Sequence, residues 1–439
     1  MSSAFVIHIA PKLHKPDRLL GRDADSRLEE AVGLTAAIGL DVIDRLIVHL
    51  ARPVPATLLG SGKVDEIAAA VRDREPDVII VNAQLSPVQQ RNLERIWKTK
   101  VLDRTALILE IFGERAQTRE GRLQVELAHL TYQRSRLVRS WTHLERQRGG
   151  FGFLGGPGET QIETDRRLIG ERLAKIRKEL EDVTRTRGLH RQARKRVPYP
   201  IVALVGYTNA GKSTLFNTLT KSEVMAKDLL FATLDPTMRA VKLPDRRKII
   251  LSDTVGFIAD LPIELVAAFR ATLEEVLQAN VVVHVRDAAH DETDDQKTDV
   301  LKVLAALGVE TEGDRKIIEV LNKIDLLDAD VRAGLATRTG TNSAGPVAIS
   351  ALTGEGLNAL LTRISDALGA GETLFDISID TTDGAGLAWV YEHGRVLQRH
   401  EKGRNIRLEV AADPGDADRF LRRFDGQITI EQHEIPRAS

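Results

Sequence analysis

The chain has 439 residues, of which 42% are hydrophobic and 28% charged, and this composition excludes a fully disordered protein. The absence of cysteine excludes disulfides, cysteine-ligated zinc, iron–sulfur clusters and thiol catalysis. The net charge of −1 says nothing about a nucleic-acid partner, so only the distribution of charge along the chain is informative. No apolar run approaches the roughly 18 residues of a membrane-spanning helix, so we expect no stable membrane insertion.

Residues 1–103 alternate between apolar runs typical of strands and stretches with helical periodicity. This alternation predicts an N-terminal α/β subdomain with parallel strands. The turn GSGK in LLGSGKVDEI (58–67) has the wrong spacing for a phosphate loop, and we interpret it as a strand-to-helix turn. The expected strands are 5–10, 42–50, 77–81 and 100–102, and the expected helices are 26–38, 63–74 and a segment after Pro87.

Residues 104–197 carry two heptad patterns, one from Leu123 to Leu144 and one from Ile162 to Val183. Between them, residues 149–159 (GGFGFLGGPGE) contain six glycines and one proline, the two poorest helix formers. The pattern predicts an antiparallel helical hairpin with a glycine-rich tip. Its first helix, from about Arg119 to Gln147, would be roughly 43 Å long.

This hairpin is basic, because residues 115–196 contain 20 Lys and Arg against 10 Asp and Glu, and 17 of the 20 are Arg. A charged run of this kind is often only a solvated helix face with a charged linker. The planar fork of arginine also suits phosphate geometry, so contact with RNA or another polyanion is the second interpretation. The charge pattern alone leaves both open.

Residues 198–369 predict a central α/β domain, and residues 373–439 a small α+β domain in which we find no chemistry. In the last segment we expect strands at 373–380, 405–411 and 427–432. We expect helices through Trp389–Arg399 and at 416–424.

A phosphate-binding motif, G-x-x-x-x-G-K-[ST], follows the apolar run IVALV and precedes the helix-like STLFNTLT, the context in which this motif is most specific. Backbone N–H groups of such a loop surround phosphate oxygens at a helix N-terminus. We expect Lys212 to neutralise the β- and γ-phosphates of a nucleotide and Ser213 to ligate Mg²⁺. The loop comprises Gly206, Tyr207, Thr208, Asn209, Ala210, Gly211, Lys212, Ser213 and Thr214.

Two further segments are placed to sense the γ-phosphate. Asp253, Thr254, Val255 and Gly256 follow the apolar strand KIILS, where an aspartate anchors the metal through water and the glycine N–H reaches the phosphate. The earlier FATLDPT segment should supply a threonine hydroxyl to Mg²⁺. Thr233 and Thr237 are both eligible, and we favour Thr233. The expected nucleotide contacts of this segment are Phe231, Ala232, Thr233, Leu234 and Asp235.

The sequence NKID (322–325) follows another apolar strand, KIIEVL. A carboxylate at Asp325 would accept hydrogen bonds from N1–H and the exocyclic amine of guanine, donors that adenine lacks at these positions. Asn322 would brace the loop and the base, and the stem of Lys323 would cover the face of the base. We count Ile324 with them among the nucleotide contacts. A backbone N–H from Ser350, Ala351 or Leu352 would bind the guanine carbonyl.

Two positions bear on hydrolysis. Ras-like GTPases place a glutamine directly after the glycine of DxxG, where it orients the attacking water, but this chain has Phe257 there. We therefore expect slow intrinsic hydrolysis, with Lys212, Thr233 and Gly256 as the catalytic set and a partner completing the site. Asn209 is either an ordinary loop residue or a ligand for K⁺ beside the phosphates.

These motifs belong to P-loop GTPases, and GGFGFLGGPGETQIETDRR (149–167) joined to a GTPase domain resembles the HflX family of the Obg–HflX group. The motifs GYTNAGKSTLFN, FATLDPT, DTVGFI, NKIDL and SALTGEG are similar to those of that family. The resemblance implies a cytoplasmic bacterial GTPase that binds GTP, GDP and the rRNA of the large ribosomal subunit. It also implies a role in ribosome rescue, splitting or biogenesis, and an N-terminal nucleotide or RNA interaction. We expect a monomer.

Three functional hypotheses remain. The first is an enzyme whose GTP hydrolysis switches a ribosome-bound state. The second is an RNA-binding assembly or anti-association factor that uses GTP only as a ligand. The third, a membrane-associated signalling GTPase, is weakened because the chain carries no lipidation motif.

Overall fold

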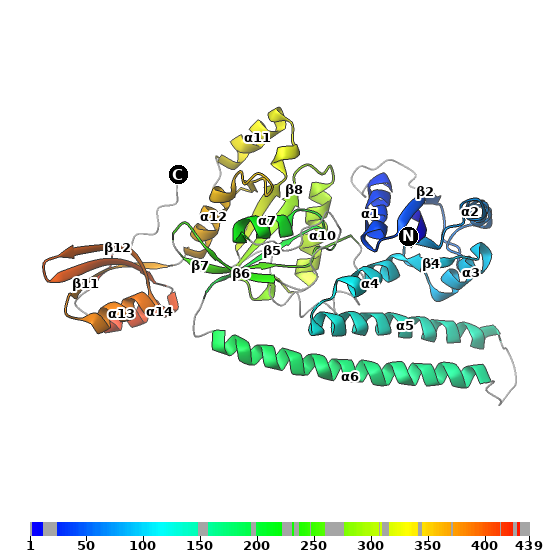
Figure 1. Ribbon diagram of the computed structural model, residues 1–439, viewed down its shortest axis with the longest axis horizontal. Coiled ribbons are helices and arrows are strands. Elements are labelled where there is room, and N and C mark those ends of the chain that lie inside the picture. Colours follow the sequence, from blue (N-terminus) through cyan, green and yellow to red (C-terminus); the bar gives the residue numbers. More distant parts are fainter. Residues whose placement is uncertain are drawn as a thin grey trace.

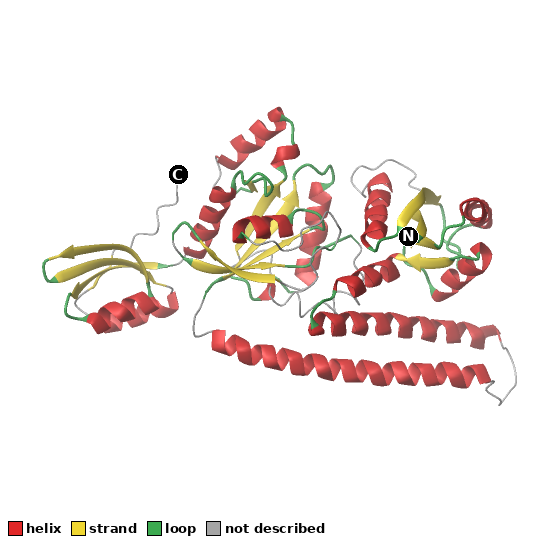
Figure 2. Cartoon of the chain, in the orientation of Figure 1, coloured by secondary structure: helices red, strands yellow, loops and turns green. Residues whose placement is uncertain are grey.

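The computed structural model contains three β-sheets and a long pair of helices (Figures 1 and 2). Across the part of the chain that is described, every helix is too short or too polar to cross a membrane. The described residues are 2–11, 24–147, 157–194, 199–221, 231, 237–245, 247–259, 276–306, 308–309, 316–340, 345–369, 372–412, 414–424 and 428–430.

The N-terminal sheet is parallel and has the order β2-β1-β3-β4, which confirms the predicted α/β subdomain. Helix α2 begins at Ser61, directly after its N-cap Gly60, so most of the GSGK segment is the first turn of the helix and not a turn before it. Helix α4 was not anticipated. The elements are β1 (Ser3–Pro11), α1 (Ala24–Ala37), β2 (Asp41–Leu50), α2 (Ser61–Arg74), β3 (Val78–Asn82), α3 (Pro87–Trp97), β4 (Lys100–Asp103) and α4 (Arg104–Arg115).

The predicted hairpin is present, with α5 at Arg119–Gln147, where the sequence placed it, and α6 at Pro157–Arg194. The helices are antiparallel and lie side by side, with α5 between α6 and the N-terminal domain (Figure 1). Glu126 on α5 pairs with Arg172 on α6, while Arg119, earlier on α5, pairs with Glu179, later on α6. Of the predicted tip at 149–159, residues 149–156 lie outside the described residues. Residues 157–159 form the start of α6, so the helix begins earlier than the glycine-rich composition predicted.

A buried carboxylate fixes α5 to the N-terminal sheet. Asp103, fully buried at the end of β4, accepts hydrogen bonds from Arg136 Nη2 at 2.5 Å and Tyr132 Oη at 2.7 Å. It also accepts the backbone N–H groups of Leu85 and Ala106. One side chain therefore caps α4 and holds the hairpin.

The central sheet has the order β10-β9-β8-β5-β7-β6, parallel except for the β6–β7 pair. This is the P-loop GTPase architecture expected from the sequence. Its elements are β5 (Ile201–Gly206), α7 (Lys212–Thr220), β6 (Thr237–Lys242), β7 (Lys248–Asp253), β8 (Val281–Asp287), α10 (Thr293–Ala306), β9 (Lys316–Asn322), the 3₁₀ turn η1 (Ile324–Leu326), α11 (Ala329–Gly340), β10 (Val347–Ala348) and α12 (Leu357–Gly369).

The C-terminal segment is the expected α+β domain, with the order β12-β13-β11-β14 and helices on one face of the sheet (Figure 1). Its connectivity, βαββαβ, is that of a ferredoxin-like fold. Four charges fix it to the β6–β7 turn: Arg247 and Arg395 both pair with Glu372, and Asp245 pairs with both arginines. The elements are β11 (Thr373–Asp380), α13 (Gly384–His393), β12 (Arg395–Lys402), β13 (Asn405–Ala412), α14 (Pro414–Arg423) and β14 (Ile428–Ile430).

One prediction in this domain was wrong. The helix expected through Trp389–Arg399 ends at His393, and Arg395–Lys402 form strand β12 instead. Gly394 has an extended backbone beneath the core, where a β-carbon would lie 2.5 Å from Val410 Cγ1 and 2.6 Å from Phe420 Cζ. Pairing with β13 outweighs the local helical pattern here.

We predict that Asp103→Ala lowers the free energy of unfolding by about 3–5 kcal/mol, because it leaves the largely buried Arg136 guanidinium, 17% exposed, without its carboxylate partner. Urea denaturation measures the change. The matched control is Asp182→Ala, whose exposed partner is Arg185 on the same helix, with an expected change within about 0.5 kcal/mol. Equal midpoints for the two variants would contradict the structural role of Asp103.

Candidate nucleotide-binding site and its contacts

The phosphate loop, Gly206–Ser213, connects β5 to α7 and can be built only with glycine at two positions. Gly206 has φ +153°, and a β-carbon there would lie 2.1 Å from the carbonyl oxygen of Val285. Gly211 has φ +90°, and its β-carbon would lie 2.2 Å from Asn322 Nδ2. The two glycines thus let the loop approach β8 and the NKID segment.

The side chain of Lys212 is buried at the start of α7, and its ammonium donates to the carbonyl oxygens of Gly206 at 3.2 Å and Tyr207 at 2.8 Å. Burial lowers the pKa of Lys212 to about 8, while the carboxylate of Asp253 acts in the opposite direction. The ammonium group of Lys212 is therefore held beside the loop and loses its proton more readily than an exposed lysine does.

Ser213 Oγ donates a hydrogen bond to Asp253 Oδ2 at 2.7 Å, and Asp253 is fully buried. A hydroxyl and a carboxylate are hard oxygen donors of the kind that Mg²⁺ prefers, especially when it is shared with phosphates. The described residues contain no group of three His, Asp or Glu that could hold a metal without such help. The pair therefore fits a magnesium ion brought by a nucleotide.

The segment that follows β7, Asp253–Ala259, is bound to the phosphate loop through its backbone. Thr208 N–H donates to the Phe257 carbonyl at 2.7 Å, and Phe257 N–H donates to the Gly206 carbonyl at 3.1 Å. Thr254 Oγ1 donates to Leu204. The side chain of Phe257 is 1% exposed and lies in an apolar cluster. A β-carbon built on Gly256 would lie 3.1 Å from Lys212 Nζ, so the DTVG glycine lies beside Lys212.

The segments predicted to bind guanine meet the phosphate loop through Asn322. Its Nδ2 donates to the Ala210 carbonyl, and its Oδ1 accepts the Ala351 N–H, both at 2.9 Å. Lys323, with φ +66°, pairs with Asp287 at 2.7 Å. Ser350 is buried, whereas the side chain of Leu352 is 78% exposed.

The structure thus brings the phosphate loop, the DTVG segment, NKID and the Ser350–Leu352 turn together at the carboxyl ends of the central strands. Asp325 lies in η1, directly after this junction. Phe231 is buried against Phe112 of α4, with ring centroids 4.8 Å apart. The expected contacts Ala232, Thr233, Leu234 and Asp235 lie outside the described residues.

The N-terminal domain makes contacts with this site that the sequence motifs did not predict. Tyr207 Oη donates to Glu30 Oε2 at 2.9 Å and accepts the Ala259 N–H at 2.8 Å. Arg104 donates to the Ala259 carbonyl at 2.9 Å and pairs with Glu30 at 2.5 Å. The tyrosine ring therefore faces the N-terminal domain, and only its backbone serves the phosphate loop.

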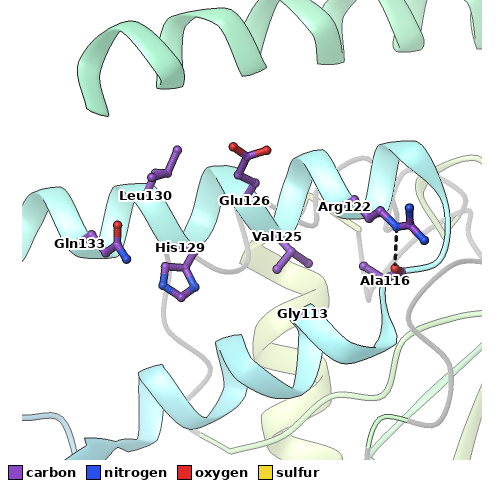
Figure 3. Close-up of a pocket in the computed structure, with 8 residues that line it drawn as sticks. All are labelled: Gly113, Ala116, Arg122, Val125, Glu126, His129, Leu130 and Gln133. Atoms are coloured by element: carbon purple, nitrogen blue, oxygen red, sulfur yellow. Dashed lines mark hydrogen bonds between the residues drawn. The ribbon is translucent and has the colours of Figure 1, made fainter. Parts of the chain in front are cut away.

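A separate cavity of about 270 Å³ lies between α4 and α5 (Figure 3). None of the motif residues lines it, and one of its lining residues, Glu126, is bound to Arg172 of α6. Its walls are formed by Gly113, Ala116, Arg122, Val125, Glu126, His129, Leu130 and Gln133.

Four protein families match successive parts of the chain. Their descriptions are GTP-binding GTPase N-terminal (residues 25–113), GTP-binding GTPase middle region (115–194), 50S ribosome-binding GTPase (201–323) and HflX C-terminal domain (335–434). A crystal structure of a GTP-binding protein from Sulfolobus solfataricus with GDP is similar at 25% identity and a TM-score of 0.43. The match covers 83% of this chain and 98% of that one.

GTPase HflX from Magnetococcus marinus is 49% identical over 415 residues, covering 94% of each chain. GTPase HflX from Escherichia coli is 46% identical over 345 residues, covering 78% of this chain and 79% of its own. The suspected resemblance is thereby confirmed: the chain belongs to the HflX family of GTPases, and its reaction is the hydrolysis of GTP.

Proposed function

We propose that this GTPase binds the large ribosomal subunit through its basic hairpin and that the ribosome stimulates its hydrolysis of GTP in ribosome rescue, splitting or biogenesis. The observation that carries the proposal is the attachment of a long basic hairpin to a domain that contacts the nucleotide site. The match to a 50S ribosome-binding GTPase family supports the choice of partner. Such a protein would act in the cytoplasm, as a monomer.

The hairpin presents several of its cations to solvent. On α6, Arg166, Lys175, Arg177 and Lys178 are exposed, while Leu173 and Ile176 are buried. Helix α6 has 38 residues, about 57 Å at 1.5 Å per residue, so the tip can enter an RNA cavity too narrow for a globular domain. Exposed cations along this length favour binding to phosphates.

We propose the nucleotide contacts from the site geometry. Ser350 N–H donates to Glu355 and Ala351 N–H donates to Asn322, so we assign the guanine carbonyl to the Leu352 N–H. Ser213 would hold Mg²⁺ directly and Asp253 through water, with Thr233 as a further ligand in the triphosphate state.

Asn209 is exposed, and its backbone has a φ of +61°. A comparison of hydrolysis rates in K⁺ and Na⁺ decides whether Asn209 binds a potassium ion beside the phosphates.

The alternative function, an RNA-binding assembly or anti-association factor with GTP as a ligand only, makes a different kinetic prediction. Single-turnover phosphate release with and without purified large subunits separates the two. Stimulation by the subunit supports the proposal. A rate that the subunit leaves unchanged while it binds tightly supports the alternative.

We predict that Asp325→Asn weakens GDP binding and improves the binding of xanthosine diphosphate. The amide donates where the carboxylate accepted, and xanthine offers a carbonyl where guanine has an amine. Fluorescence titration with both nucleotides measures the exchange. Unchanged GDP affinity with no gain for the xanthine nucleotide would contradict the assignment. Asp328→Asn, an exposed position after η1, is the matched control.

We predict that the Kd for GDP rises about tenfold between pH 7 and pH 9. The phosphates require the ammonium form of Lys212, and in the free protein this form is lost as the pH rises through about 8. Binding should therefore take up a proton above pH 8, which calorimetry in two buffers of different ionisation enthalpy detects. A constant Kd without proton uptake across this range would refute the prediction.

We predict that deletion of residues 149–158 weakens co-sedimentation with large subunits while the Kd for GDP stays within about twofold of wild type. The tip and its Phe151 and Phe153 would contact RNA, whereas the nucleotide loops lie on another domain. Measurement across a salt series tests the electrostatic part of binding. Undiminished co-sedimentation at every salt concentration would rule out the tip as the contact.

A further inference from the structure

Thr208, in the phosphate loop, has a polar atom that the nucleotide-binding motif does not explain. The residue is 6% exposed, and among the described residues its Oγ1 is buried without a hydrogen-bond partner. Its backbone is fixed, because the Thr208 N–H donates to the Phe257 carbonyl at 2.7 Å. Buried hydroxyls are nearly always paired, so an unpaired one inside a reactive site calls for a functional explanation.

The side chain of Thr208 lies beside the two groups expected at the γ-phosphate. A β-carbon built on Gly256 would lie 2.8 Å from Thr208 Cγ2 and 3.1 Å from the ammonium of Lys212. Rotation of Thr208 by about 120° about χ1 brings its hydroxyl to the place that the methyl group now occupies. Thr208, Gly256 and Lys212 therefore surround one small volume, and the threonine can turn its hydroxyl toward it.

Hydrolysis needs a group that holds a water molecule in line with the γ-phosphorus. Phe257 cannot do so, because its ring is buried in the apolar cluster and both of its backbone polar groups are bonded to the phosphate loop. A threonine hydroxyl both donates and accepts hydrogen bonds. It can therefore accept a hydrogen bond from water while donating to a phosphate oxygen.

We propose that Thr208 is a catalytic residue for GTP hydrolysis and that its hydroxyl hydrogen-bonds to the attacking water. The water oxygen forms a bond to the γ-phosphorus as the bond from that phosphorus to the β–γ bridging oxygen breaks. The proton of the water passes to the phosphate that is released, so Thr208 keeps its own proton. The proposal rests on the binding of GTP by the phosphate loop, and the test measures that binding separately.

The experiment compares Thr208→Val, which removes the hydroxyl at nearly constant volume, with Thr208→Ser, which keeps it. Single-turnover hydrolysis of bound GTP is measured beside the Kd values for GDP and a non-hydrolysable GTP analogue. Thr208→Val should lower the rate tenfold or more, the factor that corresponds to about one hydrogen bond in the transition state. Its Kd values should stay within about twofold of wild type, and Thr208→Ser should retain most of the rate.

Thr220→Val is the matched control, because the Thr220 hydroxyl bonds to Phe216 within α7 and should not influence hydrolysis. Wild-type hydrolysis by Thr208→Val, or an equal loss in Thr208→Ser, would overturn the proposal. So would weaker binding of the GTP analogue alone, with an unchanged rate. If Thr208→Val does not bind GDP, the smaller Thr208→Ala replaces it, and a wild-type rate in that variant overturns the proposal.

Discussion

The backbone of Ala259 is held at both ends, and this double contact determines how the N-terminal domain meets the GTPase domain. The Tyr207 hydroxyl accepts its N–H, and Arg104 donates to its carbonyl. Glu30 binds both of these side chains, so one carboxylate sets the positions of a tyrosine from the phosphate loop and an arginine from α4. Because Arg104 and Glu30 are largely buried, removing either one would leave a charge without a partner in a region of low dielectric constant.

Apolar packing surrounds this polar contact. Phe231, Val255, Phe257 and Ile258 of the GTPase domain share one buried cluster with Ile108 and other residues of α4 and the N-terminal sheet. The replacement of the usual glutamine by Phe257 therefore has a structural meaning. The ring packs in the apolar cluster that the two domains share, so other groups must make the hydrogen bonds that glutamine makes near the γ-phosphate in Ras-like GTPases.

The sequence predicted the features that depend on local pattern. The phosphate loop, NKID and the limits of α5 follow from spacing and periodicity, because glycine geometry and the heptad repeat act over a few residues. The contact between Arg104 and Ala259 joins residues 155 positions apart and has no periodic signal. The strand at Arg395–Lys402 was also missed, since only the packing of Gly394 beneath Phe420 shows why the helix must end. Contacts between domains join residues far apart in the sequence and become visible only in the folded chain. The conformation of each loop is determined by a few neighbouring residues and can be predicted from them.

Two neighbouring residues connect the hairpin to the nucleotide site. Asp103 binds Arg136 of α5, and Arg104, the next residue, binds the carbonyl of Ala259. Both sit where β4 passes into α4, with Asp103 capping the helix through the Ala106 N–H, so neither can move far without the other. A change in the segment after DTVG that altered the Ala259 contact would act on the same helix start that holds α5. Linkage is reciprocal for binding, so a partner that shifted the hairpin would bias that segment by the same free energy.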